Sequence, residues 1–203
     1  MTFLEHVLFR RPRILNVLHK LRLVNATSQT NDEELQALAR YAKGARIALE
    51  IGSYQGVSAA VIARNLASDG RLVCVDPWPT NGKRDNPEFK IFARHLERTK
   101  TKHKIHVIRD FSTNALEQLP PKVDFAFIDG DHSWSGIAED WAIVSSRAVD
   151  GTFVCLHDTA VPQAEPFRIF ESCRFYNEVI KSNSGFELVE TVYSMRVLRK
   201  RKT

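Results

Sequence analysis

Three acidic residues and one histidine in the second half of the chain are the side chains best suited to chemistry. Asp129, Asp131 and His132 lie together in the stretch FIDGDHSW, and Asp158 follows a later apolar run in the stretch LHDT. Carboxylate oxygens such as those of Asp129 and Asp158 suit Mg²⁺ or Mn²⁺, and such an ion lowers the pKa of a hydroxyl bound to it. Because the intrinsic pKa of histidine lies near neutral, His132 is a candidate general base. The pattern predicts proton removal from a hydroxyl group.

Each of these assignments has a structural alternative. Asp129 could cap the helix expected after it, although an Asp-x-Asp-His cluster at the end of a strand favours a site. His132 could serve only to orient Asp131 or a substrate. Asp158 is equally compatible with metal binding and with a purely structural role. His157, which precedes it, is most simply a histidine satisfied at the end of a strand.

A second pattern occurs earlier, in LEIGSYQGVSAAVIAR, where Glu50 ends an apolar run and Gly52 and Gly56 frame a polar turn. Glycine allows a backbone to approach a ligand closely and to adopt torsions that other residues resist. The carboxylate of Glu50 would repel a phosphate but attract an ammonium group through water or backbone amides. The turn therefore suits a zwitterion better than a pyrophosphate, unless these residues only shape the turn.

An acidic residue also follows the next apolar run, in the stretch CVDPW. In related folds, an acidic residue at the position of Asp76 binds the two hydroxyls of a ribose. Its carboxylate can accept one hydrogen bond from each hydroxyl, in bidentate fashion. Asp110 follows the third apolar run and is expected beside an adenine, with Phe111 against the face of that base. Ser53 and Tyr54, in the turn after the first run, are further expected neighbours of the ligand. The ligand outlined is an adenosine that carries an amino acid, which describes S-adenosyl-L-methionine.

Alternating strands and helices would bring these residues together. Short apolar runs alternate with amphipathic helical patterns, and such alternation requires parallel strands joined by crossover helices. Two β-rich runs at the end of the chain predict a hairpin at one edge. We therefore expect an α/β fold with a Rossmann-like, doubly wound, mainly parallel seven-stranded sheet and a C-terminal antiparallel hairpin. The expected strands are 46–51, 71–75, 104–108, 123–128, 152–156, 186–192 and 194–198, and the expected helices are 57–66, 88–99, one between 108 and 123, 134–147 and 166–181.

The first 44 residues are expected to form a helical segment that packs on the core. A capped helix start at residues 30–33 is followed by apolar residues at helical spacing and closed by Gly44. The preceding stretch has an acid at Glu5 and Pro12 in its middle, and it lacks the order of a signal peptide. Its basic amphipathic character leaves open a contact with a membrane surface, a partner or a second copy of the chain.

Composition bounds the remaining possibilities. The 203 residues suffice for one globular domain, and the formal net charge is +5, with a basic run at 199–202. No aromatic residues are interleaved with cations in the manner of a nucleic-acid site, so nucleic acid is an unlikely partner. The three cysteines lie far apart, which favours a reducing cytoplasmic setting. No apolar run approaches the length of a transmembrane helix.

The motifs EIGSYQG, CVDPW, FIDGDHSW and LHDT, each after its own predicted strand, resemble the class I S-adenosylmethionine-dependent methyltransferases from about residue 46 to 198. FIDGDHSW and LHDT are similar to a branch of small-molecule O-methyltransferases that includes sugar and macrolide-sugar enzymes. The resemblance implies a methyltransferase domain over residues 45–203, a small hydroxylated acceptor and one set of site residues. The cofactor-binding residues would be Glu50, Gly52, Ser53, Tyr54, Gly56, Asp76, Asp110, Phe111 and Asp129, the catalytic residues Asp129, Asp131 and His132, and the metal ligands Asp129 and Asp158.

The chain departs from the family pattern in two places. The middle glycine of the commonest first motif is absent, and Ser53, Tyr54 and Gln55 fill the turn. Catechol-type relatives place an Asp-Asn pair after the fifth strand to hold a divalent metal, whereas this chain has Asp158 and Thr159. A metal ion is therefore optional in the prediction.

Two other function classes remain open. A nicotinamide-dependent oxidoreductase would share the glycine turn and the ribose acid, but the G-x-G-x-x-G spacing is missing and an edge hairpin is expected. A non-catalytic module could bind the cofactor and dock on a partner through its N-terminal helix and basic tail. The Asp129, Asp131 and His132 cluster argues against such a module.

Overall fold

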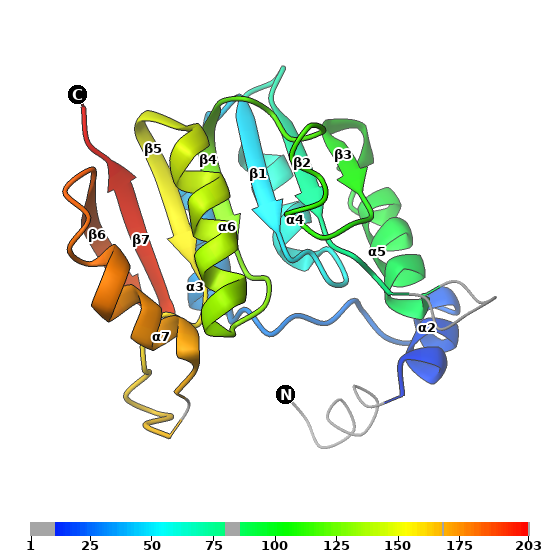
Figure 1. Cartoon of the computed structure of the whole chain (residues 1–203). Helices are drawn as coiled ribbons and strands as arrows, with labels where there is room; N and C mark the ends of the chain where they lie inside the picture. Colours follow the sequence, from blue (N-terminus) through cyan, green and yellow to red (C-terminus); the bar gives the residue numbers. More distant parts are fainter. Residues whose placement is uncertain (1–10, 80–85, 168, 203) are drawn as a thin grey trace.

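A seven-stranded sheet forms the centre of the protein in the computed structural model, which describes residues 11–79, 86–167 and 169–202 (Figure 1). The strands follow the order β3-β2-β1-β4-β5-β7-β6 across the sheet. Their bounds are β1 Ile47–Ile51, β2 Arg71–Val75, β3 Ile105–Ile108, β4 Val123–Ile128, β5 Ala148–Leu156, β6 Phe186–Val192 and β7 Met195–Lys200. The mainly parallel seven-stranded sheet is confirmed.

The pairing of the strands also follows the prediction. Strand β1 pairs in parallel with both β2 and β4, so the winding reverses at β1. The last two strands form the C-terminal hairpin, in which β7 pairs antiparallel with both β5 and β6. A crevice forms beyond the carboxyl ends of the strands where the winding of an open α/β sheet reverses.

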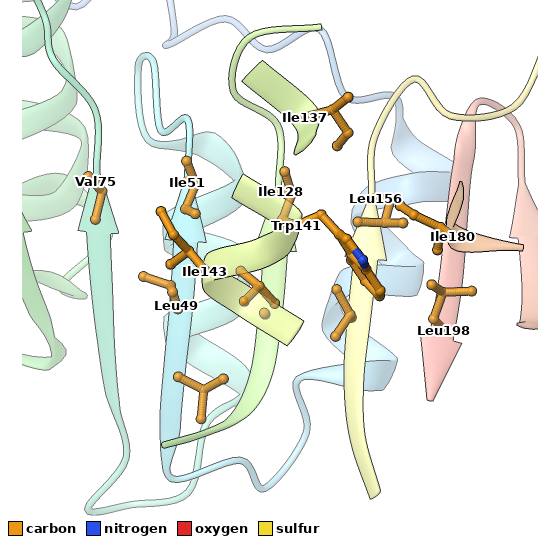
Figure 2. Packing of buried hydrophobic residues seen from close by; sticks show 14 of the residues in the cluster. Leu49, Ile51, Val75, Ile128, Ile137, Trp141, Ile143, Leu156, Ile180 and Leu198 are labelled. Carbon is orange, nitrogen blue, oxygen red and sulfur yellow. The ribbon is translucent and has the colours of Figure 1, made fainter. Parts of the chain in front are cut away.

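Helices cover both faces of the sheet (Figure 1). One apolar core joins the sheet to α6 (Trp134–Arg147) and to the consecutive α7 (Glu171–Phe175) and π-helical η2 (Tyr176–Ile180). Figure 2 shows Trp141 of α6 lying over this face, near Ile128 and Leu156. A second core on the opposite face joins the sheet to α3 (Asp32–Tyr41), α4 (Val57–Asn65) and α5 (Pro87–Arg98).

The N-terminal helices pack against this layered core. The predicted start of α3 is confirmed, because the side chain of Asn31 accepts from the backbone of Glu34 while the Glu34 carboxylate accepts from the backbone of Asn31. Helix α2 (Pro12–Lys20) lies on α5, where Arg98 donates to the backbone oxygen of His19. Residues 1–10, the rest of the predicted basic amphipathic segment, lie outside the described residues. Within the described ranges, no helix combines the length and apolar character needed to cross a bilayer.

The prediction of a helix between β3 and β4 is wrong, because residues 109–122 form a series of turns and bends. Asp110 caps the first turn by accepting hydrogen bonds from the backbone of Phe111 and the side chain of Asn114. Short polar side chains of this kind compete with a helical backbone, and two prolines at 120–121 remove donors at the other end. The helix expected over 166–181 is also shorter, since the regular structure begins at Glu171.

Candidate active site

Most of the predicted residues line two adjoining pockets at the carboxyl ends of the strands, whereas Glu50 and Asp158 are fully buried and line neither. The larger pocket has a volume of about 430 Å³, and its lining includes Asp110, Phe111 and Asp131. The smaller one has a volume of about 230 Å³ and lies against the turn after β1 and the loop that carries His132. Both pockets are lined by Gly52, Asp76, Asp129 and Gly130. The arrangement provides a two-part site with Asp129 at the junction.

Gly52 is required by a backbone contact. Its φ is +86°, and a Cβ at this position would overlap the carbonyl oxygen of Asp129 in the turn after β4. The turns after β1 and β4 therefore touch directly. Gly56 begins α4 with a φ of +82°, and a Cβ there would lie 2.7 Å from the ring of Phe92.

Asp76 joins the end of β2 to the turn after β1. One of its carboxylate oxygens, Oδ2, accepts hydrogen bonds from the backbone amides of Ser53 at 3.0 Å and Tyr54 at 2.9 Å. The other, Oδ1, accepts from the backbone amide of Trp78 at 2.9 Å. Because each carboxylate oxygen has two lone pairs, Oδ2 is fully used and Oδ1 can still accept one hydrogen bond from a ligand hydroxyl.

Glu50 lies beneath this turn and is not among the residues that line either pocket. It is fully buried, and its carboxylate accepts a hydrogen bond of 2.6 Å from the hydroxyl of Ser53. Burial raises the pKa of Glu50 to about 7. Any influence of Glu50 on a ligand would therefore pass through Ser53 and the turn, and its predicted role at the cofactor stays a prediction.

The far end of the larger pocket contains an acidic residue that the sequence interpretation did not single out. Asp140 of α6 lines this pocket beside Asp110 and Phe111, and it accepts a hydrogen bond of 2.5 Å from Ser112. Burial raises the pKa of Asp140 to about 6. Phe111 is 61% exposed, so one face of its ring remains available to a ligand.

The structure removes one alternative reading of Asp129. The N-cap of α6 is Ser133, whose hydroxyl accepts from the amide of Gly136. Asp131 supports this cap by accepting from the backbone amide and the hydroxyl of Ser133, and these hydrogen bonds lower the pKa of Asp131. Asp129 is therefore not the helix cap and points into the site instead.

Asp129 meets two histidines. Its Oδ1 atom lies 2.8 Å from Nδ1 of His157 and 3.7 Å from Nε2 of His132. Asp158 reaches the same two nitrogens, with its Oδ2 atom 3.6 Å from each. Asp129, His132, His157 and Asp158 thus form one cluster, in which the carboxylates of Asp129 and Asp158 are partners of His157.

Glu34 of α3 contacts the other ring nitrogen of His157, since its Oε2 atom lies 3.4 Å from Nε2. The other carboxylate oxygen of Glu34 accepts from the amide and the hydroxyl of Ser194, in the turn between β6 and β7. Burial lowers the pKa of His157, but Asp129, Glu34 and Asp158 outweigh it and raise this pKa to about 10. Nothing in the sequence near Glu34 signals this contact, which joins parts of the chain far apart.

The segment after Asp158 folds back onto the loop that carries His132. The ring of Phe170 lies 5.1 Å from that of His132, and the amide of Ser172 donates to the backbone oxygen of His132. Thr159 donates its hydroxyl to the backbone oxygen of Leu156.

A sequence profile described as a methyltransferase domain matches residues 49–159, the part of the chain that carries the two pockets. The chain belongs to this methyltransferase family. The predicted resemblance to the class I methyltransferases is therefore confirmed in family and fold. Membership argues against the nicotinamide-dependent oxidoreductase.

Sequence identity to individual methyltransferases is low. Tricin synthase 1 from Oryza sativa subsp. japonica is 27% identical over 136 residues, which cover 59% of this chain and 51% of that protein. The chain thus spans about half the length of this curated relative.

Solved structures share the fold over most of the chain. An O-methyltransferase from Bacillus cereus in complex with SAH is 23% identical, with a TM-score of 0.66 and coverage of 93% of this chain and 89% of that chain. The O-methyltransferase TomG from Streptomyces achromogenes, involved in tomaymycin synthesis and solved with SAM, is 20% identical, with a TM-score of 0.64 and coverage of 95% and 90%. At these identities the likeness concerns the fold.

Proposed function

We propose that the protein is an S-adenosylmethionine-dependent O-methyltransferase that acts on a small hydroxylated acceptor such as a sugar or a natural product. The observation that carries this proposal is the pair of adjoining pockets lined in common by Gly52, Asp76 and Asp129. Family membership supplies the methyl transfer, and the solved relatives named with SAH and SAM support the cofactor. The relatives named as O-methyltransferases support oxygen as the methylated atom.

The two pockets suit the two ends of the cofactor. The adenosine would lie in the larger pocket, with a ribose hydroxyl on Oδ1 of Asp76 and its adenine between Asp110 and Phe111. The amino-acid end would lie along the turn that carries Ser53 and Tyr54, in the smaller pocket. The sulfonium methyl group would then face the junction at Asp129, beside the loop that carries His132.

Methyl transfer to oxygen is an in-line displacement. The bond from the acceptor oxygen to the methyl carbon forms as the carbon–sulfur bond breaks, and the hydroxyl proton leaves. Positioning supplies much of the rate of such a reaction, and removal of the proton supplies most of the rest. His132 as a base and a divalent ion at Asp129 and Asp158 are two ways to assist that removal, and both stay predictions. The donor atoms fit an ion, which when bound would lower the pKa of the acceptor hydroxyl.

The test is a methyl-transfer assay with S-adenosylmethionine and a panel of sugars, phenols and other hydroxylated small molecules, with and without divalent ions. We expect release of S-adenosylhomocysteine that depends on the acceptor, and a loss of at least about 100-fold in Asp129→Asn. Asp69→Asn, a change at an exposed aspartate outside both pockets, should keep wild-type activity.

Two outcomes would contradict the proposal in different ways. Cofactor binding without turnover of any hydroxylated acceptor would favour the non-catalytic module. Turnover only with amine or thiol acceptors would keep the methyltransferase and overturn the oxygen specificity. The predicted homodimer and cytoplasmic location stay predictions, and light scattering on the purified protein would test the former.

A further inference from the structure

Four donor atoms lie close together at the ends of β4 and β5, and each imidazole nitrogen contacts two carboxylate oxygens. In order of contact they are Nδ1 of His157, Oδ1 of Asp129, Nε2 of His132 and Oδ2 of Asp158, which contacts Nδ1 of His157 again. Successive contacts measure 2.8, 3.7, 3.6 and 3.6 Å. The donor atoms of Asp129, His132 and His157 all lie within 4.8 Å of one another.

These separations match those of ligands that share one metal ion. Two donors bound at about 2.1 Å to one ion are about 3.0 Å apart at a right angle and about 3.4 Å apart at the tetrahedral angle. The contacts between Asp129, Asp158 and the two histidines bracket those values. The donor atoms of Asp129, His132 and His157 are therefore close enough to share one ion, and Oδ2 of Asp158 lies beside both histidines.

The environment of His157 points to the same ligand. Its side chain is 1% exposed, and its two ring nitrogens face carboxylates, with Nδ1 2.8 Å from Oδ1 of Asp129 and Nε2 3.4 Å from Oε2 of Glu34. A buried imidazole in such a place either carries a proton between the carboxylates or binds a metal ion through one nitrogen. A metal ion held jointly by Nδ1 and Asp129 would take the place of that proton, because both atoms would then direct lone pairs at the ion.

Glu34 completes the arrangement behind the imidazole. Its Oε2 atom lies 3.4 Å from Nε2 of His157, and its other oxygen is held by Ser194. A histidine that binds a metal through one nitrogen commonly has a carboxylate at the other, which fixes the ring and makes it a better ligand. This role explains why a glutamate from α3 is buried beside the end of β5.

We propose that Asp129, His132 and His157, with Asp158 alongside, form a site for a divalent transition-metal ion of the zinc type rather than for magnesium. Imidazole nitrogens suit Zn²⁺, Fe²⁺ and similar ions, whereas Mg²⁺ prefers oxygen donors and retains water. The prediction from the sequence considered only Asp129 and Asp158, whose carboxylates alone would favour magnesium or manganese. The two histidines change the expected ion.

The inference deepens the proposed function and rests on it only for what the ion would do. With the ion bound, Nε2 of His132 would be a ligand instead of a general base. The ion would then assist proton removal by lowering the pKa of the acceptor hydroxyl. Metal binding itself requires no methyl transfer, so it can be tested alone.

The test begins with protein stripped of metal by a chelator. Calorimetric titration with zinc chloride and with magnesium chloride should give one equivalent of Zn²⁺ bound at least about tenfold more tightly than Mg²⁺. Titration with Co²⁺ should produce the visible absorption of a four-coordinate ion with nitrogen ligands. Absence of zinc binding, or tighter binding of magnesium, would overturn the proposal.

Variants locate the ion. His132→Ala and His157→Ala should each weaken zinc binding by at least about tenfold, and Glu34→Gln by about 10- to 100-fold. His106→Ala, at an exposed position on β3, is the matched control and should bind zinc as the wild type does. Because the side chain of His132 is 27% exposed, its variant should fold even where a change at the buried His157 does not. Unchanged zinc affinity in a folded His132→Ala would contradict the assignment.

A titration with S-adenosylhomocysteine on the same samples separates this inference from the proposed function. Cofactor binding without zinc binding would overturn the metal site and leave the methyltransferase standing. Zinc binding without cofactor binding would support the metal site and overturn the methyltransferase.

Discussion

Gly52 and Asp129 touch through their backbones, since a Cβ on Gly52 would overlap the carbonyl oxygen of Asp129. The first glycine of EIGSYQG thus joins the turn after β1 to the turn after β4, in addition to any approach to a ligand. Both residues line both pockets, so the contact sets the junction of the site.

Gly52→Ala should therefore destabilise the protein much more than Gly44→Ala. Both glycines have a positive φ, +86° and +81°, but nothing lies within 4 Å of a Cβ at Gly44. We expect a loss of about 1 kcal/mol in the free energy of unfolding for Gly44→Ala, from backbone strain alone, and at least about 3 kcal/mol for Gly52→Ala. Urea unfolding of both variants measures the difference, and equal losses would mean that the backbone contact is not tight.

Glu50 should make stability depend on pH. Burial raises its pKa from 4.5 to about 7, so between these values the folded protein binds a proton that the unfolded chain has released. Stability from this group is thus present below pH 4.5 and is lost as pH rises through 7. Relative to the wild type, Glu50→Gln should become more stable by up to about 3 kcal/mol between pH 4.5 and pH 8.

The measurement is urea unfolding of wild type and Glu50→Gln at several pH values in that window. Glu33→Gln, at an exposed position on α3, should show no such trend. A constant difference between Glu50→Gln and wild type across the window would show that Glu50 titrates normally.

Phe111 should contribute stacking energy to the cofactor. It lines the larger pocket and is 61% exposed, so its removal should leave the fold intact. Stacking of one base on an aromatic ring contributes about 1–3 kcal/mol, so Phe111→Ala should weaken S-adenosylhomocysteine binding by about 10- to 100-fold. Phe167→Ala, at a ring that is 96% exposed and lines neither pocket, should bind as the wild type does. Equal affinity of all three proteins would place the adenine elsewhere.

Features that depend on a local pattern of residues could be predicted from the sequence. Apolar runs located each strand to within a few residues, and the acids at the strand ends followed from them, because carboxyl ends of parallel strands share one edge. Asp76 and Asp129 illustrate this, since they end different strands and line both pockets. The capped start of α3 was equally local and is confirmed.

Contacts between distant parts of the chain could not be read in the same way. Glu34 is a helix-capping residue by its local pattern, yet it also lies against His157 and Ser194. The turns at 109–122 place Ala115 and Leu119 in the core at a spacing that imitates a helix. His157 does have partners after the end of β5, as a satisfied histidine should, but only the folded chain shows that these partners are three carboxylates.

The most direct test of the proposed methyltransferase is calorimetric titration of S-adenosylhomocysteine into wild type and Asp76→Asn. Asp76 would lose a charge-assisted hydrogen bond to the ribose and part of its hold on the turn that carries Ser53 and Tyr54. We predict one equivalent bound by the wild type and affinity lower by at least about tenfold in the variant. Absence of binding to the folded wild type would contradict the account.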